Sequence, residues 1–196
     1  RTEQGPAADV LQELLEAEIG IRTPEDAGSA TVELMTRGLD EVELRLHRID
    51  VEGWLRAGGR PGSLGDLDVS IVAPDRTWTV PVPDGGVERR FTTEVPVPGP
   101  GLYAATAATT DREARTLLLV SDARVLARAQ GPDLAMVALR DGEPVRGARF
   151  WVQSAGQVVA VRPDREGLAR VELQEAPAVV VAQTAGGPAL LQVGTS

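Results

Sequence analysis

The feature that most constrains the fold is a long series of short apolar runs, separated by turns rich in Gly, Pro and Asp. Within the runs, apolar and polar residues often alternate; Val42 and Leu44 would share one face of an extended chain, and Glu43 and Arg45 the other. Such runs at regular spacing are typical of an antiparallel β-sandwich. The predicted strands are 31–36, 42–51, 67–73, 77–82, 88–95, 102–108, 114–120, 124–129, 134–140, 148–154, 157–163, 168–174, 178–184 and 189–193.

The series contains a repeated pattern, which divides it into two halves. The segments GLYAATAATTDREARTLLLV and APAVVVAQTAGGPALLQV each read as an Ala-rich strand, a polar or Gly-containing turn and an aliphatic strand. Each would be the closing hairpin of a domain. The sequence therefore predicts one sandwich at residues 29–120 and a second at 121–196, both of ordinary domain size.

In the N-terminal part, the apolar residues recur with a different period from the alternation of the strands. Over residues 7–19, Val10, Leu11, Leu14, Leu15 and Ile19 recur at helical spacing, with Pro6 before them and Gly20 after them. Residues 23–29 are rich in turn formers and read as a linker. The predicted fold class is thus mostly β: an N-terminal α-helix and linker over residues 1–28, followed by two antiparallel sandwiches of immunoglobulin or fibronectin type III kind.

Composition excludes several classes of function. The chain has no cysteine, which removes disulfides, thiolate metal sites and cysteine nucleophiles. Its net charge of −9 disfavours nucleic acid as a partner. No apolar run is long enough for a transmembrane helix, and the opening residues lack the pattern of a signal peptide, so we expect a piece of a longer protein.

Catalysis is also disfavoured. His47 is the only histidine, and alternation places it on the polar side of its strand between Arg45 and Arg48, so we expect it at the surface. The chain has no metalloprotease, nucleophile-elbow or phosphate-loop motif. We predict no catalytic residues, no metal and no cofactor.

Two pairs of carboxylates and one tryptophan are the remaining candidates for a site. Asp66 with Asp68, and Asp164 with Glu166, have the types of ligand needed for calcium or acid–base chemistry, but lack the dense spacing of a calcium loop. We expect the first pair to face solvent and the second to form a plain hairpin turn. Trp54, beside a Gly-rich loop, is the candidate interaction residue; the alternative is a plug for one end of the sandwich.

The stretch GEPVRGARFW at 142–151 reads as a corner between strands. Pro144 cannot donate to a strand ladder, Val145 offers an apolar side chain to the core, and Gly147 and Ala148 allow close approach of the backbone. Around it, residues 134–173 run as a strand, a Gly-x-Pro-Val-x-Gly-Ala corner, a further strand and an Asp-x-x-Gly turn. Residues 36–55 and 100–128 add an alternating run ending in Asp, and a Gly-x-Tyr strand followed by Thr-Leu-x-x-Val-Ser-Asp.

In this order, over about residues 30–193, the motifs resemble tandem macroglobulin-like domains of the bacterial alpha-2-macroglobulin family. The resemblance implies structural domains of a periplasmic or extracellular protein that traps proteases, with the other domains of the same chain, and proteases, as partners. That family captures proteases with a Cys-x-x-Gln thioester, which a chain without cysteine cannot contain. The alternative is an extracellular ligand-binding or carbohydrate-binding sandwich attached to a larger protein.

Overall fold

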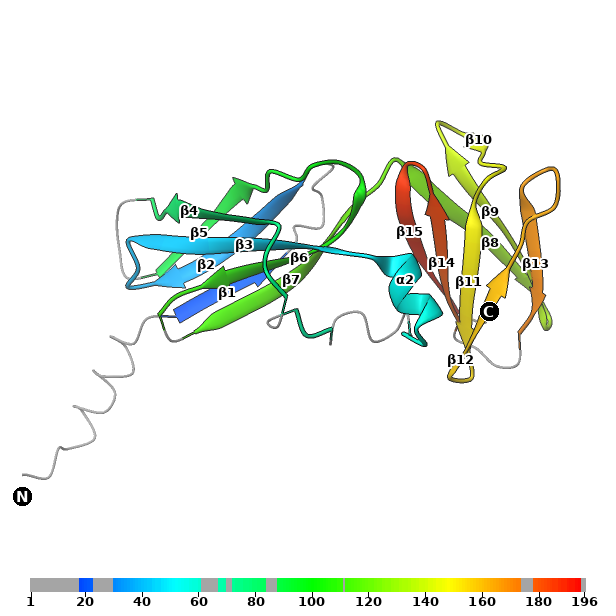
Figure 1. Cartoon of the computed structure of the whole chain (residues 1–196), viewed down its shortest axis with the longest axis horizontal. Coiled ribbons are helices and arrows are strands. Elements are labelled where there is room, and N and C mark those ends of the chain that lie inside the picture. The colour runs from blue at the N-terminus through cyan, green and yellow to red at the C-terminus, as the bar shows by residue number, and fades with distance from the viewer. Residues whose placement is uncertain are drawn as a thin grey trace, which may run out of the picture. The chain divides into compact units, whose positions relative to one another are not determined.

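Antiparallel strands form nearly all the regular structure in the computed structural model of the chain (Figure 1), which describes residues 18–22, 30–60, 67–69, 72–83, 88–110, 112–173 and 178–194. The contacts between residues divide the chain into two units. The first contains residues up to His47, Val72–Pro96 and Ala104–Leu118, and the second contains Arg48–Ile71, Val97–Tyr103 and the chain from Leu119 onward.

Two sheets build the first unit. One has the order β1-β2-β5, and the other has the order β4-β3-β6-β7. Leu34 from the first sheet packs in one cluster with Val42, Leu44 and Ala107 from the second, so the core lies between the sheets. Strands β3, β6 and β7 each continue into the second unit at one end. The strands are β1 (Glu18–Arg22), β2 (Thr31–Arg37), β3 (Glu41–Ile49), β4 (Arg76–Pro81), β5 (Glu88–Glu94), β6 (Gly101–Ala108) and β7 (Glu113–Val120).

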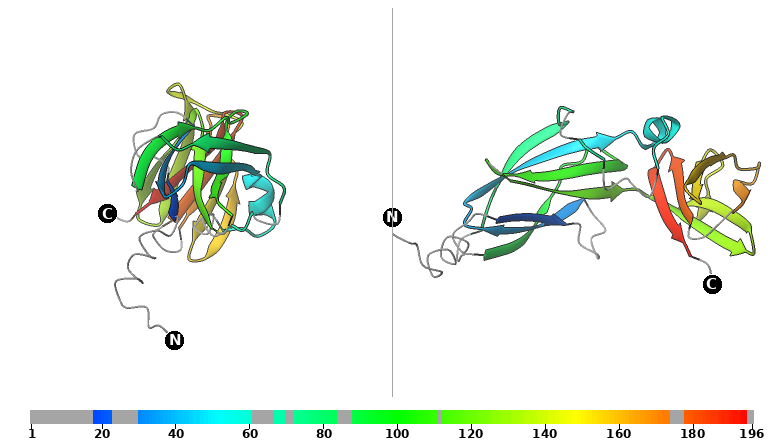
Figure 2. Two further views of the ribbon diagram at one scale, coloured as in Figure 1. Left: turned by 90° about the vertical axis from the view of Figure 1, so that its left-hand side faces the viewer. Right: turned by 90° about the horizontal axis from the view of Figure 1, so that it is seen from below.

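The second unit contains two four-stranded sheets, which Figure 2 shows from two further sides. In one, β9 pairs with β8, β10 and β13; the other has the order β12-β11-β14-β15. Leu134 and Met136 from the first sheet pack against Phe150 and Val180 from the second. Its strands are β8 (Ala123–Gln130), β9 (Asp133–Arg140), β10 (Glu143–Pro144), β11 (Arg149–Ser154), β12 (Gln157–Val161), β13 (Leu168–Glu172), β14 (Ala178–Thr184) and β15 (Gly187–Val193).

The mostly β, antiparallel fold class is confirmed, and most strands lie where alternation places them. The corner at 142–151 is confirmed with one refinement. Glu143 and Pro144 pair with Arg140 and Leu139 as the short strand β10, before Val145 turns onto the core. Pro144 lies at the edge of the sheet, where its missing N–H leaves no ladder bond unmade.

Two sequence-based assignments are wrong. Residues 18–22 form strand β1, which places Ile19 opposite Thr36, so the predicted helix does not extend to Ile19 and Gly20 does not end it. The rest of that helix lies outside the described residues. The predicted strand at 67–73 is also wrong for the described residues of that range, 67–69 and 72–73, which lie outside every strand.

His47 is buried and not at the surface, with 6% of its area exposed. Alternation fails at this point because Leu46 and His47, adjacent residues of β3, are both buried. The His47 Nε2 atom lies 3.1 Å from the carbonyl oxygen of Val72, to which it can donate, and Nδ1 has no hydrogen-bond partner. His47 therefore fixes the segment before β4 by a side-chain bond in place of strand pairing.

Tyr103 anchors the start of β6. Its side chain is fully buried, and its hydroxyl donates to the carbonyl of Gly99 four residues upstream, over 2.7 Å. A tyrosine near the start of a strand that bonds back to the preceding turn is the tyrosine corner of immunoglobulin-type sandwiches. The Gly-x-Tyr pattern in the sequence is therefore a local fold determinant.

Tyr103→Phe should keep the fold and lower its stability. The substitution removes only the hydroxyl and leaves the Gly99 carbonyl without this donor, which costs about 1–2 kcal/mol of the free energy of unfolding. Urea unfolding followed by circular dichroism measures the loss. An unchanged unfolding midpoint would show that the Tyr103 hydroxyl does not stabilise the corner.

Candidate functional site

A short helix, α2 (Val51–Arg56), follows directly on β3. Asp50 caps its N-terminus, because its side chain accepts from the backbone N–H of Gly53 over 3.0 Å. Glu52 lies in the first turn and Arg56 in the last, the arrangement that the helix dipole favours. Val51 and Leu55 are buried, so one side of α2 packs on the protein.

The helix lies beside the outward face of the sheet β12-β11-β14-β15. Phe150 and Val152 point into the sandwich, so Arg149 and Trp151 point outward. Trp151 and its cross-strand partner Val181 are nevertheless almost fully buried. Glu52 of α2 forms an ion pair with Arg149, which ties the helix to this face of the sheet.

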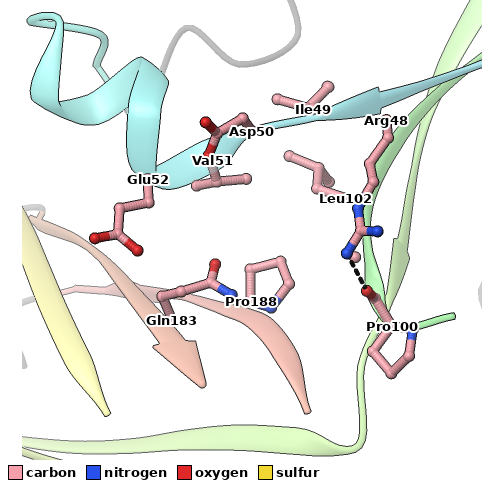
Figure 3. A pocket seen from close by; sticks show the side chains of 10 residues that line it. Arg48, Ile49, Asp50, Val51, Glu52, Pro100, Leu102, Gln183 and Pro188 are labelled. Carbon is pink, nitrogen blue, oxygen red and sulfur yellow. Dashed lines mark hydrogen bonds between the residues drawn. The ribbon is translucent and has the colours of Figure 1, made fainter. Parts of the chain in front are cut away.

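A pocket of about 340 Å³ lies next to α2 (Figure 3). Its walls come from the end of β3, the start of α2, the entry to β6, and the neighbouring strands β14 and β15. All of these segments belong to the second unit. The lining residues are Arg48, Ile49, Asp50, Val51, Glu52, Pro100, Gly101, Leu102, Gln183 and Pro188.

Each polar side chain of the pocket already has a partner within the protein. Arg48 donates to the Pro100 carbonyl over 3.2 Å, and Gln183 donates to the Thr184 carbonyl over 3.1 Å. Asp50 is the helix cap, and Glu52 pairs with Arg149 and, at 2.5 Å, with Arg56. Of these bonds, the one from Arg48 to the Pro100 carbonyl joins two walls of the pocket.

The β14–β15 hairpin that borders the pocket packs closely on neighbouring backbone. The Gly186 carbonyl accepts from the Asp122 N–H over 3.3 Å and from the Ser121 hydroxyl over 3.2 Å. Gly187 has a φ of +102°, and a Cβ there would lie 3.1 Å from the Val120 carbonyl oxygen and 3.0 Å from the Pro100 side chain. Glycine is therefore required by both its backbone conformation and its surroundings.

Trp54, the predicted interaction residue, lies on α2 and is half-buried. It packs against Gly59, where a Cβ would overlap the indole ring at 2.3 Å. Trp54 does not line the pocket. Its role in contacting a partner stays a prediction.

One of the two acidic pairs, Asp164 with Glu166, lies wholly within the described residues. The Asp164 carboxylate accepts from the N–H groups of Glu166 and Leu168, over 3.0 and 2.9 Å, and so closes a turn between β12 and β13. These two strands lie in different sheets, so the turn is a crossover and the predicted hairpin is wrong. Asp68 is exposed, and Asp66 lies outside the described residues. No group of three or more His, Cys, Asp or Glu side chains that could hold a metal occurs among the residues with a described position.

Sequence reasoning missed the pocket because α2 was not predicted: only its first residue, Val51, was placed in a strand, and Trp54 was placed beside a loop. The Asp50 cap, Glu52, Arg56 and the glycines at 58 and 59 are signals for a short helix. Chemically, the pocket offers two carboxylates, one guanidinium group, one carboxamide and apolar walls. His47, the chain's only histidine, lies elsewhere.

Comparisons with known proteins find the same architecture. No family model matches the sequence, and no curated protein matches it. Among solved structures, the two-domain NIE-MG1 part of Escherichia coli alpha-2-macroglobulin superposes with a TM-score of 0.64 at 16% identity, covering 91% of this chain and 98% of that one. The chain shares the fold of these alpha-2-macroglobulin domains.

Larger pieces of the same kind of protein give similar values. The MG0-NIE-MG1 part of the E. coli protein has a TM-score of 0.65 at 16% identity, with 90% of this chain and 64% of that one covered. Salmonella alpha-2-macroglobulin reacted with methylamine has a TM-score of 0.63, and this chain spans 12% of its length. The resemblance to tandem macroglobulin-like domains is confirmed at the level of the fold.

Gly187→Ala should destabilise the second unit far more than Gly156→Ala. Both glycines have positive φ, +102° and +73°, but nothing lies within 4 Å of a Cβ at Gly156. Gly156→Ala should cost about 1 kcal/mol for its backbone conformation, and Gly187→Ala about 1–3 kcal/mol more for overpacking. Urea unfolding of both variants measures the difference. Equal losses would show that the close approach at Gly187 is unimportant.

Proposed function

We propose that this chain is a pair of structural, non-catalytic macroglobulin-like domains of a larger alpha-2-macroglobulin-like protein that traps proteases. The observation that carries the proposal is the match to both domains of the NIE-MG1 structure over 98% of its length. A single shared sandwich fold is common among unrelated proteins, but a match that covers two consecutive sandwiches is more specific.

The pocket beside α2 supports a structural role. Its arginine, carboxylates and carboxamide are engaged in caps, ion pairs and bonds to backbone carbonyls. A catalytic site needs acid, base or nucleophilic groups directed at a substrate, whereas these groups are directed at the protein itself.

None of the helices among the described residues has the length and the apolar character of a membrane-spanning helix.

By domain order, the predicted sandwich at 29–120 corresponds to the NIE domain and that at 121–196 to the MG1 domain. The partners would be neighbouring domains of the same chain, with proteases contacted by the whole protein, in the periplasm or outside the cell. Since the chain has no cysteine, any thioester must lie in another part of the protein.

The test compares this chain with the full-length protein that contains it. Each is incubated with a broad-specificity protease, and residual activity is measured on a large protein substrate and on a small peptide substrate. Trapping by the full-length protein should abolish cleavage of the large substrate and spare the small one, because enclosure excludes substrates by size. The 196-residue chain alone should change neither activity.

Two results would contradict the proposal. Inhibition by the isolated chain would place protease binding in these domains. Equal loss of cleavage of both substrates by the full-length protein would indicate a blocked protease active site and not enclosure.

A further inference from the structure

The strands β8, β9 and β13 lie side by side in one sheet of the second unit (Figure 1), and the outward face of this sheet is unusually apolar. The even-numbered residues of β9 between 134 and 138 belong to the core, so Ala135, Val137 and Leu139 point outward. A sheet face that meets solvent normally carries polar side chains. The central strand of this face carries three apolar ones instead.

The strand register extends the apolar surface across the sheet. Val137 lies opposite Leu126 of β8 and Leu168 of β13, so three aliphatic side chains form a row across three strands. Leu126 is 55% exposed, and the other two are half-buried. In the other sheet of this unit, the outward-facing Trp151 and Val181 are almost fully buried. The apolar row on β8, β9 and β13 therefore lies open at the surface.

Arginines border this apolar row on both sides. Arg128 and Arg170 stand opposite Ala135, one position along the face from the row, and Arg124 stands opposite Leu139 on the other side. All three arginines are exposed, and none of them forms an ion pair with another described residue. The row is thus flanked by positive charge in a chain whose net charge is −9.

The charges on this face disfavour a membrane or a second copy of the chain as the partner. Asp133 and Glu172 stand opposite each other at one end of the face, beyond two of the arginines. Surfaces that bind anionic lipid carry about 4–8 basic residues, whereas this one carries three beside two carboxylates. A two-fold interface centred on the apolar row would place arginine against arginine.

The spacing of the arginines fits the width of a helix. Arg124 and Arg128 are four residues apart on β8, which corresponds to about 13 Å along the strand. An α-helix with its side chains is about 10–12 Å wide. The apolar row crosses three strands, a distance of about 10 Å, which is the length of about two helical turns.

We propose that this face binds an acidic amphipathic helix of a protein partner. The apolar stripe of the helix lies on the row formed by Leu126, Val137 and Leu168, and carboxylates on both sides of the stripe pair with the bordering arginines. Arginine suits this role because its planar guanidinium pairs with a carboxylate through two hydrogen bonds. The proposal rests on the face itself and does not depend on the function proposed above.

The probe is a synthetic helical peptide with one stripe of leucines and glutamates on both sides of the stripe. Its control peptide has lysine in place of every glutamate. Binding to the full chain is measured by fluorescence anisotropy of the labelled peptide at low ionic strength. The glutamate peptide should bind and the lysine peptide should not, and the affinity should fall as salt is added.

Variants of the chain show whether binding occurs on this face. Arg128→Glu with Arg170→Glu should weaken binding of the glutamate peptide at least about tenfold and create binding of the lysine peptide, because the charge of the border is reversed. Leu126→Asn should weaken binding of the glutamate peptide about tenfold. The matched control is Arg162→Glu with Arg165→Glu, two exposed arginines of the same unit outside this face, which should change nothing. Circular dichroism checks that each variant is folded.

The proposal is overturned if the glutamate peptide does not bind, or if its binding survives the substitutions at 126, 128 and 170. Two other results overturn it by assigning the face to a different partner. One is binding to phosphatidylserine vesicles, lost on Arg128→Glu with Arg170→Glu, without binding to the peptide. The other is a dimer in light scattering that Leu126→Asn dissociates.

Discussion

The structure depends on the burial of β6. All eight residues of Gly101–Ala108 are buried, so this strand has no solvent-facing side. Its small side chains allow close packing on both faces, in a chain that is only 3% aromatic. The few aromatic residues are then placed where they also fix geometry: Tyr103 holds the entry to β6, and Phe150 and Trp151 pack on opposite faces of β11. Because this central strand is buried and a hydrogen bond holds its entry, its position determines where the outer strands can lie.

Much of the fold could be predicted from the sequence because most strands bury one face. The alternation in β2 and β3 is visible residue by residue in the burial of Val32, Leu34, Val42 and Leu44. It failed where burial has another cause. His47 is buried through a side-chain bond to Val72, and β1 is a strand because β2 pairs with it, neither of which is encoded in local periodicity. The site was less predictable, since a helix of six residues is too short to show a helical period.

The pocket beside α2 illustrates how polar side chains can serve architecture. Glu52 is placed by the Asp50 cap at the start of the helix and reaches Arg149 on β11, a residue 97 positions further along the chain. An exposed ion pair of this kind adds little to stability by itself. The ion pair instead fixes where the helix lies along the strand, because it joins a helix cap to one outward-facing position on a particular strand.

The pocket beside α2 shows why volume alone is a weak guide to a binding site. Its polar side chains are directed at protein partners: Arg48 donates to the Pro100 carbonyl, Asp50 caps the helix, and Gln183 donates to the Thr184 carbonyl. A polar ligand entering the pocket would have to displace one of these bonds, and a buried group left without its partner costs about 1–3 kcal/mol. The hydrogen bonds already made by the lining groups therefore say more about binding than the volume that those groups enclose.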